Sequence, residues 1–346
     1  MHQWAARAAL IGLLSLRQAG VEPHVHSTAA VESGHDMSEL WQEPAHVAER
    51  NLFTGSTAGV PAPLVGRTMT MLSQKTSGFS AGYDVRDAAG HDWSVKLGDE
   101  AQTEVVASRL VWAVGFHQPP TFYVSEWTLA GGPSPGPQPP ARFRPKDDGL
   151  DSVGVWSWHH DPFVGTTPYQ GLLATMLLLN STDLRTENNI VYRVKQKGPN
   201  EMWYVVRDLG ATLGETGVYR PRRNDIDAFE ASPFLVSDSD GDSPKFGFQG
   251  LQRELLRDVD APALRWMADL YGQLSDRQWH DAFRAGGYDE ATASRYIAAL
   301  KDRVAAAASI DPSFDGDDSD YWAGRTFPKV LHAIKQIPHA VGDLFH

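Results

Sequence analysis

Short segments in which apolar and polar residues alternate dominate the chain between residues 64 and 130. This period of two predicts strands over residues 69–74, 93–97 and 121–127. A Gly-bearing turn at Ala89 and Gly90 joins the first two extended segments into a hairpin. A run with helical spacing, EVVASRLVWAVGF, begins at Glu104 and predicts a helix with one apolar face and with Glu104 near its start.

The second half of the chain has a mainly helical pattern. An almost unbroken apolar run to Leu179, with Thr166 or Thr167 as N-cap and Pro168 in the first turn, predicts a buried helix. Two strands follow, over residues 190–194 and 202–207. Apolar residues at spacings of three and four then continue to about residue 308, with Ser275 and Asp289 as N-caps. The predicted fold class is therefore α+β, with a β-rich N-terminal lobe and a mainly helical C-terminal lobe.

Composition divides the chain into five parts. The stretch GGPSPGPQPP at residues 131–140 predicts a long loop, because Pro and Gly interrupt helices and strand ladders. In the following RFRPKDDG, Arg142, Arg144 and Lys146 either face an anion from an extended segment or belong to a solvated loop. The predicted parts are a leader and lead-in segment (1–63), an N-lobe (64–130), a Pro/Gly-rich and charged loop (131–149), a C-lobe (150–308) and a C-terminal tail (309–346).

Length, charge and cysteine content narrow the functional classes. The 346 residues, 42% of them hydrophobic, are enough for two lobes with their own cores. A formal charge of −12 argues against a broad nucleic-acid surface, and the absence of Cys excludes disulfides, thiolate metal sites and cysteine nucleophiles. Histidines such as His24, His26 and His35 lack a regular metal-ligand spacing, which favours exposed polar residues.

The N-terminal apolar run leaves the location of the protein open. Arg7 precedes apolar residues 8–16, a length that suits either the core of a secretory signal peptide or a short amphipathic helix of a cytoplasmic protein. A signal peptide would direct the protein to the periplasm or outside the cell. The run is too short to cross a bilayer and no other segment approaches that length, so we expect no membrane span.

Two acidic residues and an amide carry the strongest chemical signal. Asp183 is followed five residues later by Asn188, and Asp208 follows the second predicted strand in the tripeptide DLG. In ATP-dependent phosphotransferases the first Asp handles the acceptor hydroxyl, while the Asn and the later Asp hold Mg²⁺. Asn189 lies next to Asn188, so the pattern leaves the metal-ligand position ambiguous by one residue.

A second set of candidates lies about a hundred residues upstream. Lys96 belongs to an alternating strand and Glu104 to the next helix, an arrangement that presents an ammonium group to the α- and β-phosphates of a nucleotide. The alternative is a surface lysine beside a glutamate at the start of a helix. Gly78 and Gly82, in the preceding hairpin, would let backbone amides approach a phosphate.

The order of these parts resembles that of the protein-kinase-like superfamily, and more closely its atypical bacterial and secretory branches, such as the HipA-like, Fam20-like and CotH-like kinases. The resemblance covers about residues 64–308 and rests on motif order and spacing. Ser181 and Thr182 stand where ordinary protein kinases carry His-Arg, and DLG replaces DFG. The separation of eight residues between Lys96 and Glu104 is shorter than in ordinary kinases and matches the atypical branches better.

The resemblance implies a bilobal kinase fold that uses ATP and Mg²⁺ or Mn²⁺. Lys96 would contact the α- and β-phosphates, and Glu104 would orient Lys96 or bind a second metal. Asp183 would act as base, and Asn188 and Asp208 as metal ligands. The implied activity is transfer of the γ-phosphoryl group to a hydroxyl of a protein or small molecule, with no nucleic-acid partner. A pseudokinase that only binds a nucleotide or partner, and an AMP transferase on the same fold, remain alternatives.

Overall fold

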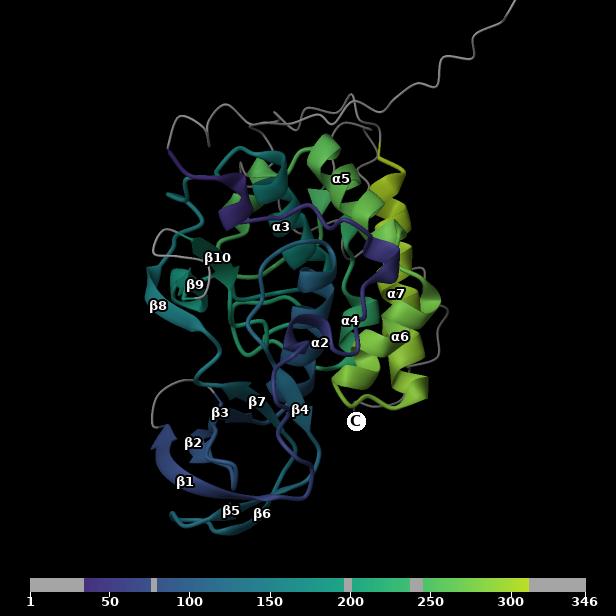
Figure 1. The fold of residues 1–346 in the computed structure, drawn as a ribbon. Coiled ribbons are helices and arrows are strands. Elements are labelled where there is room, and N and C mark those ends of the chain that lie inside the picture. The colour runs from purple at the N-terminus through teal and green to yellow at the C-terminus, as the bar shows by residue number, and fades with distance from the viewer. Residues whose placement is uncertain (1–33, 76–79, 196–200, 237–244, 311–346) are drawn as a thin grey trace, which may run out of the picture.

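The computed structural model describes residues 34–75, 80–195, 201–236 and 245–310 (Figure 1). Gly78, the apolar run at residues 8–16, His24 and His26, and the tail from residue 311 onward lie outside these ranges. In the part of the chain that is described, no helix is both long and apolar enough to cross a membrane.

A curled sheet of seven strands forms the N-terminal lobe (Figure 1). Its order is β4-β7-β3-β2-β1-β5-β6, and β1 pairs with β5 in parallel, whereas the other pairs are antiparallel. The predicted strand at 121–127 is two strands, β4 and β5. The strands are β1 (Thr68–Lys75), β2 (Gly82–Arg86), β3 (Asp92–Leu97), β4 (Phe122–Val124), β5 (Trp127–Ala130), β6 (Gly136–Gln138) and β7 (Ala141–Pro145).

The predicted loop at residues 131–149 is wrong for much of its length, because it contains β6 and β7. Pro137, on β6, lies opposite Thr128 of β5. Because β6 is the edge strand of the sheet, a proline without an N–H group is tolerated there. Pro145 is the last residue of β7. Arg142 and Arg144 are each only 5% exposed, which also rules out the solvated-loop interpretation for these two residues.

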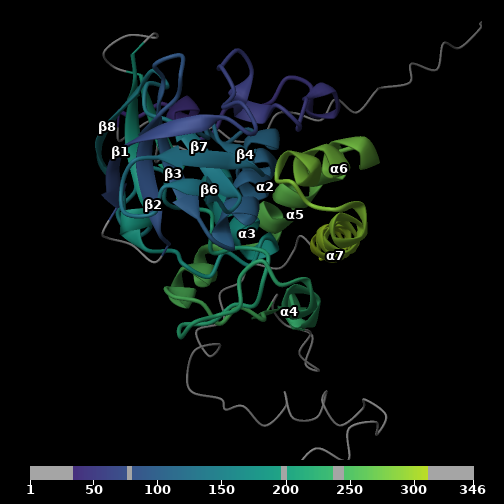
Figure 2. The same cartoon turned by 90° about the horizontal axis from the view of Figure 1, so that it is seen from below.

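Helix α2 (Glu100–Ala113) connects the sheet to the C-terminal helices and is buried along almost its whole length (Figure 2). It contacts β7 and β3 on one side and α6 on the other. The helix starts four residues earlier than predicted, so Glu104 lies one turn inside it. Asp99, at the N-cap position, makes no side-chain capping bond. The helix therefore begins without the local signal that would have marked its start.

The C-terminal lobe combines a small sheet with helices, which confirms the predicted α+β class and is consistent with a bilobal kinase-like fold (Figure 1). Thr166, Ser275 and Asp289 cap their helices as predicted. The elements are β8 (Leu150–Val155), α3 (Thr167–Leu178), η4 (Thr186–Asn188), β9 (Asn189–Val194), β10 (Met202–Val206), α4 (Ile226–Ala231), β11 (Leu235–Val236), β12 (Lys245–Phe246), η5 (Arg253–Asp258), α5 (Ala261–Gly272), α6 (Asp276–Ala285) and α7 (Glu290–Ala308).

Residues 34–63, predicted as part of a lead-in segment, belong to the folded body. They form only short 3₁₀ turns, η1 (Met37–Glu39), η2 (Val47–Glu49) and η3 (Gly55–Thr57), which explains the missing helical or strand period. Leu40 and Leu52 are fully buried in the core of the C-lobe. The Gln278 side chain of α6 donates hydrogen bonds to the backbone oxygens of Val47 (2.7 Å) and Arg50 (2.9 Å).

Candidate functional site

A cavity of about 340 Å³ lies between the two lobes and collects almost all of the predicted site residues. Its walls come from β1–β3, α2, β7, the segment around η4 and the turn after β10. Six predicted residues line it together: Gly82, Lys96, Glu104, Asp183, Asn188 and Asp208. These residues span more than 120 positions of sequence, so only the fold brings them together.

Lys96, on β3, is held by three carboxylates. Its Nζ lies 2.7 Å from Glu100 Oε2, 3.0 Å from Glu104 Oε2 and 2.8 Å from Asp208 Oδ1. The Lys96 side chain is only 12% exposed. The predicted pair with Glu104 is therefore present, and the alternative of a surface lysine is wrong. The bond to Asp208 links the N-lobe sheet directly to the turn that begins the DLG tripeptide.

Glu104 is 1% exposed and keeps its charge because cations surround it. Its Oε1 lies 2.9 Å from Arg142 Nε and 2.7 Å from Arg144 Nη2, while Oε2 pairs with Lys96. Burial alone would raise the pKa of Glu104, but the attraction of Arg142, Lys96 and Arg144 outweighs burial and holds the pKa well below its ordinary value. Glu104 is thus an ionised anchor that orients Lys96 from within the core.

The cavity is electropositive in an otherwise acidic protein. Four acidic side chains line it, together with seven basic ones: Lys75, Lys96, Arg142, Arg144, Arg185, Arg207 and Arg223. Burial, with the nearby charge of Arg142, lowers the pKa of Lys75 to about 8. Low-dielectric walls of one charge sign concentrate anions in a cleft. The cavity therefore suits a ligand with several negative charges, such as a polyphosphate.

Asp208 and Gly210 of the DLG tripeptide form a tight turn against α2. The backbone N–H of Gly210 donates to Asp208 Oδ1 at 3.2 Å, and the Thr103 hydroxyl donates to the oxygen of Gly210 at 2.8 Å. A Cβ on Gly210 would lie 2.7 Å from Glu100 Cβ and 3.0 Å from Lys96 Nζ. Glycine is therefore required here by the close approach of the turn to the helix. The Asp208 side chain remains 45% exposed to the cavity.

Asp183 and Asn188 lie on the C-lobe wall of the cavity. Asn188 Nδ2 donates to the backbone oxygen of Asp183 at 2.9 Å, which fixes the loop between them. The backbone oxygen of Asn188 in turn accepts from the N–H groups of Arg207 (2.9 Å) and Asp208 (3.2 Å). Asp183 itself forms a two-bond pair with Arg185, at 2.7 and 2.6 Å. The carboxylate predicted as base is thus occupied by a neighbouring guanidinium.

The structure separates Asn188 from Asn189. Asn188 lines the cavity, whereas Asn189 is fully buried and its Nδ2 donates to the backbone oxygen of Trp156 at 3.3 Å. Only the Asn188 side chain faces the cavity. Gly82 also lines the cavity, where a Cβ would meet the Val95 oxygen at 2.4 Å, so strand packing alone is enough to explain this glycine.

The sequence analysis missed Glu100, which bridges Lys96 and the segment after DLG. Its Oε2 contacts Lys96 and accepts from the Ser80 hydroxyl at 2.9 Å, and its Oε1 pairs with Arg223. A signal for it exists in the sequence, because Glu100 and Glu104 are four residues apart and share a helix face. Arg142 and Arg144 were singled out, but their buried pairing with Glu104 was not predicted.

The oxygen donors at the cavity fit a divalent cation. Mg²⁺ is bound in proteins by one or two carboxylates together with phosphate oxygens and water. Asp208 offers a half-exposed carboxylate and Asn188 an amide oxygen, and both line the same cavity as the seven basic residues. This set has too few ligands to hold a metal without a phosphate ligand. It is chemically suited to a metal that arrives with a nucleotide.

Comparisons with known proteins give only a distant similarity. No protein-family model matches the chain, and no curated protein matches it. Among solved structures, it is similar to the crystal structure of a Helicobacter pylori proinflammatory kinase, CtkA. That match covers 69% of this chain and 94% of that chain, with a TM-score of 0.42 and 12% sequence identity. Similarity at this level transfers neither an activity nor a residue role to this chain.

Proposed function

We propose that the protein is an atypical kinase that uses Mg²⁺ or Mn²⁺ and ATP to phosphorylate a hydroxyl of a protein or small molecule. The observation that carries the proposal is the meeting of Lys96, Asp183, Asn188 and Asp208 in one basic cavity between the lobes. Phosphoryl transfer requires positioning and cancellation of charge more than covalent participation of the protein. A buried ammonium, two oxygen donors for a metal and a further carboxylate in the same cavity are the groups that this chemistry needs.

In the proposed reaction, each of these residues has one role. Lys96, held in place by Glu104, binds the α- and β-phosphates of ATP. Asn188 and Asp208 would hold the metal, which would supply positive charge to the phosphate oxygens. Asp183 orients the acceptor hydroxyl and accepts its proton at a carboxylate oxygen. The acceptor oxygen forms a bond to the γ-phosphorus as the bond to the bridging oxygen breaks, and ADP leaves.

Two side chains, Asp183 and Lys96, must change partners before the reaction. Asp183 has to exchange Arg185 for the acceptor, and Lys96 has to exchange some of its contact with Asp208 and Glu100 for phosphate oxygens. Arg185 is exposed, so its pair with Asp183 competes with water. These contacts describe a resting site in which carboxylates occupy the place of the triphosphate.

The same contacts favour a second candidate, a pseudokinase that binds a nucleotide or partner without turnover. If Asp183 stays paired with Arg185 and Lys96 stays shared by three carboxylates, the site can still bind a nucleotide although no phosphoryl transfer follows. An AMP transferase would use the same residues with the nucleotide reversed. The three functions differ in what is transferred: the γ-phosphoryl group, AMP or nothing. That difference decides the experiment.

Transfer of label from ATP tests the proposal. The protein is incubated with Mg²⁺ or Mn²⁺ and either γ- or α-labelled ATP, with protein and small-molecule hydroxyl acceptors supplied. A kinase transfers label from γ-labelled ATP only, and Asp208→Ala abolishes the transfer. Asp151→Ala, which removes an exposed carboxylate of β8, is the matched control and should leave transfer unchanged. Label from α-labelled ATP alone would show an AMP transferase, and metal-dependent binding without transfer would favour the pseudokinase.

A further inference from the structure

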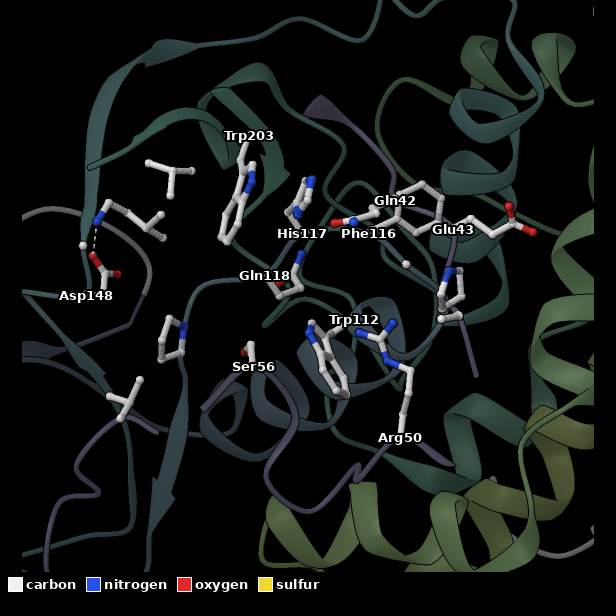
Figure 3. Close-up of a pocket in the computed structure, with 18 residues that line it drawn as sticks. Gln42, Glu43, Arg50, Ser56, Trp112, Phe116, His117, Gln118, Asp148 and Trp203 are labelled. Carbon is white, nitrogen blue, oxygen red and sulfur yellow. Dashed lines mark hydrogen bonds between the residues drawn. The ribbon is translucent and has the colours of Figure 1, made fainter. Parts of the chain in front are cut away.

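A second cavity, of about 580 Å³, lies behind the connection between the lobes (Figure 3). Its walls come from the lead-in segment between residues 42 and 60, the end of α2 with the residues after it, and residues of β8–β10 and the connection before β8. It shares no lining residue with the candidate active site. The volume lies within the range of small-molecule sites, roughly 300–1,000 Å³.

Two tryptophans in this cavity are each backed by another planar group. The rings of Trp203 and His117 stack at 4.4 Å with an angle of 3° between their planes. The Arg50 guanidinium lies over the Trp112 ring at 3.7 Å. Figure 3 shows these two pairs on either side of Gln118. Backing on one face holds each indole in place, so a flat ligand has rigid aromatic surfaces on which to stack.

Two polar side chains of the cavity, Gln118 and Asp148, offer hydrogen-bond acceptors. Gln118, which is 4% exposed, donates its Nε2 to the backbone oxygen of Val206 at 3.1 Å, so its own carbonyl oxygen is left as an acceptor. Asp148 accepts the N–H of Leu150 at 3.1 Å through one carboxylate oxygen, whereas the exposed Glu43 points its carboxylate away from Gln118 (Figure 3). The only guanidinium among the lining residues, Arg50, is held over Trp112. Because this guanidinium already stacks on an indole and the Asp148 carboxylate lines the cavity, the lining disfavours an anionic ligand.

From these observations we propose that the cavity binds a planar heteroaromatic ligand that carries amino groups and is neutral or cationic, of the nucleobase or nucleoside class. The aromatic surfaces accept the ring, and the Gln118 and Asp148 oxygens accept hydrogen bonds from its amino groups. A nucleoside triphosphate is disfavoured by charge, which distinguishes this ligand from the substrate proposed for the active site. The binding claim does not depend on the proposed kinase function.

The cavity is also connected to the candidate active site. Trp203 lies on β10, the strand that leads into Asp208, and Gln118 holds the same strand through Val206, two residues before Asp208. A ligand that packs against Trp203 and Gln118 therefore acts on the position of Asp208. If the protein is a kinase, the ligand would regulate it through this strand, and that part of the inference rests on the proposed function.

Calorimetric titration of adenosine, adenine and 2,6-diaminopurine into the full chain tests the binding claim. We expect one of these probes to bind in a 1:1 ratio. Asp148→Asn should weaken that binding by about tenfold, because an acceptor for the amino group is replaced in part by a donor. Val60→Trp, which fills the cavity from the lead-in segment, should abolish binding. The matched control Asp147→Asn changes the neighbouring exposed carboxylate, which does not line the cavity, and should leave binding unchanged.

A variant of the active site separates the two sites. Lys96→Met should bind the same probe as tightly as the wild type, and the melting temperature of each variant shows that it is folded. The proposal is overturned if none of the three probes binds. It is equally overturned if the binding persists unchanged in both Asp148→Asn and Val60→Trp, because the ligand then lies elsewhere.

Discussion

Replacement of Glu104 by glutamine removes the only carboxylate, among the residues that the structure describes, that contacts all three of Lys96, Arg142 and Arg144. Glu104 and the two arginines are each at most 5% exposed, and the Lys96 side chain is 12% exposed. A neutral amide retains the size of the side chain but leaves three neighbouring cations without their shared counter-charge. Breaking a buried ion pair by removal of one partner costs about 3–5 kcal/mol. We expect Glu104→Gln to lower the free energy of unfolding by an amount in this range.

The pH dependence of the free energy of unfolding below pH 4.5 should change as well. The pKa of Glu104 in the folded protein lies below its ordinary value of 4.5, because the three cations outweigh the effect of burial. The stability from this carboxylate is therefore present above pH 4.5 and is lost as the pH falls below that value toward the folded-state pKa. In Glu104→Gln this part of the pH dependence should disappear.

Urea denaturation followed by near-ultraviolet circular dichroism, between pH 3.5 and 7.5, measures both effects. Glu215→Gln is the matched control, because Glu215 pairs with Arg222 on the surface and such pairs are worth at most about 1 kcal/mol. The reasoning is refuted if Glu104→Gln and Glu215→Gln unfold with the same free energy at pH 7, or if Glu104→Gln retains the full acid dependence of the wild type.

Three further predictions follow from single contacts. Gly210→Ala should destabilise the protein by about 1–3 kcal/mol, because its Cβ would lie 2.7 Å from a side-chain carbon of α2. Gly154→Ala, whose Cβ would have no atom within 4 Å, should not destabilise the protein, and thermal melting compares the two variants. ATP affinity should fall as the pH rises through about 8, where Lys75 loses its charge, and Lys75→Met should remove this dependence in a titration series. Asn188→Ala should impair metal-dependent ATP binding and lower the melting temperature only slightly, because its hydrogen bond is partly exposed. Asn189→Ala should lower the melting temperature more, because it removes a fully buried hydrogen bond.

The pattern of the sequence was sufficient for the strands and helices that carry their own signals. Lys96 lies in an alternating strand, and Asp208 closely follows a strand that comes after a turn, so both were correctly located. Thr166, Ser275 and Asp289 were recognised as N-caps because a short polar side chain before an apolar helix typically accepts a hydrogen bond from a backbone N–H of the first turn. Local chemistry at these positions agrees with the global fold.

Other features depend on contacts that are distant in sequence. The strands β6 and β7 lie in a Pro-rich stretch whose composition predicts a loop. Only the sheet order shows that β6 is an edge strand, where proline is tolerated. Residues 34–63 lack periodicity, yet Leu40 and Leu52 are buried in a core cluster formed mainly by residues of the C-lobe and of α2. The pairing of Glu104 with Arg142 and Arg144 likewise requires the register of β7 beside β3. Local patterns hold no information about these partners.

The central claim of this account is that Asp208 binds a metal together with the triphosphate that Lys96 holds. Calorimetric titration of a non-hydrolysable ATP analogue, with and without Mg²⁺, into the wild type and Asp208→Asn tests it most directly. We predict that Mg²⁺ strengthens binding to the wild type, that the gain is absent in a folded Asp208→Asn variant, and that Lys96→Met weakens binding under both conditions. An equal gain from Mg²⁺ in the wild type and in Asp208→Asn would contradict the claim.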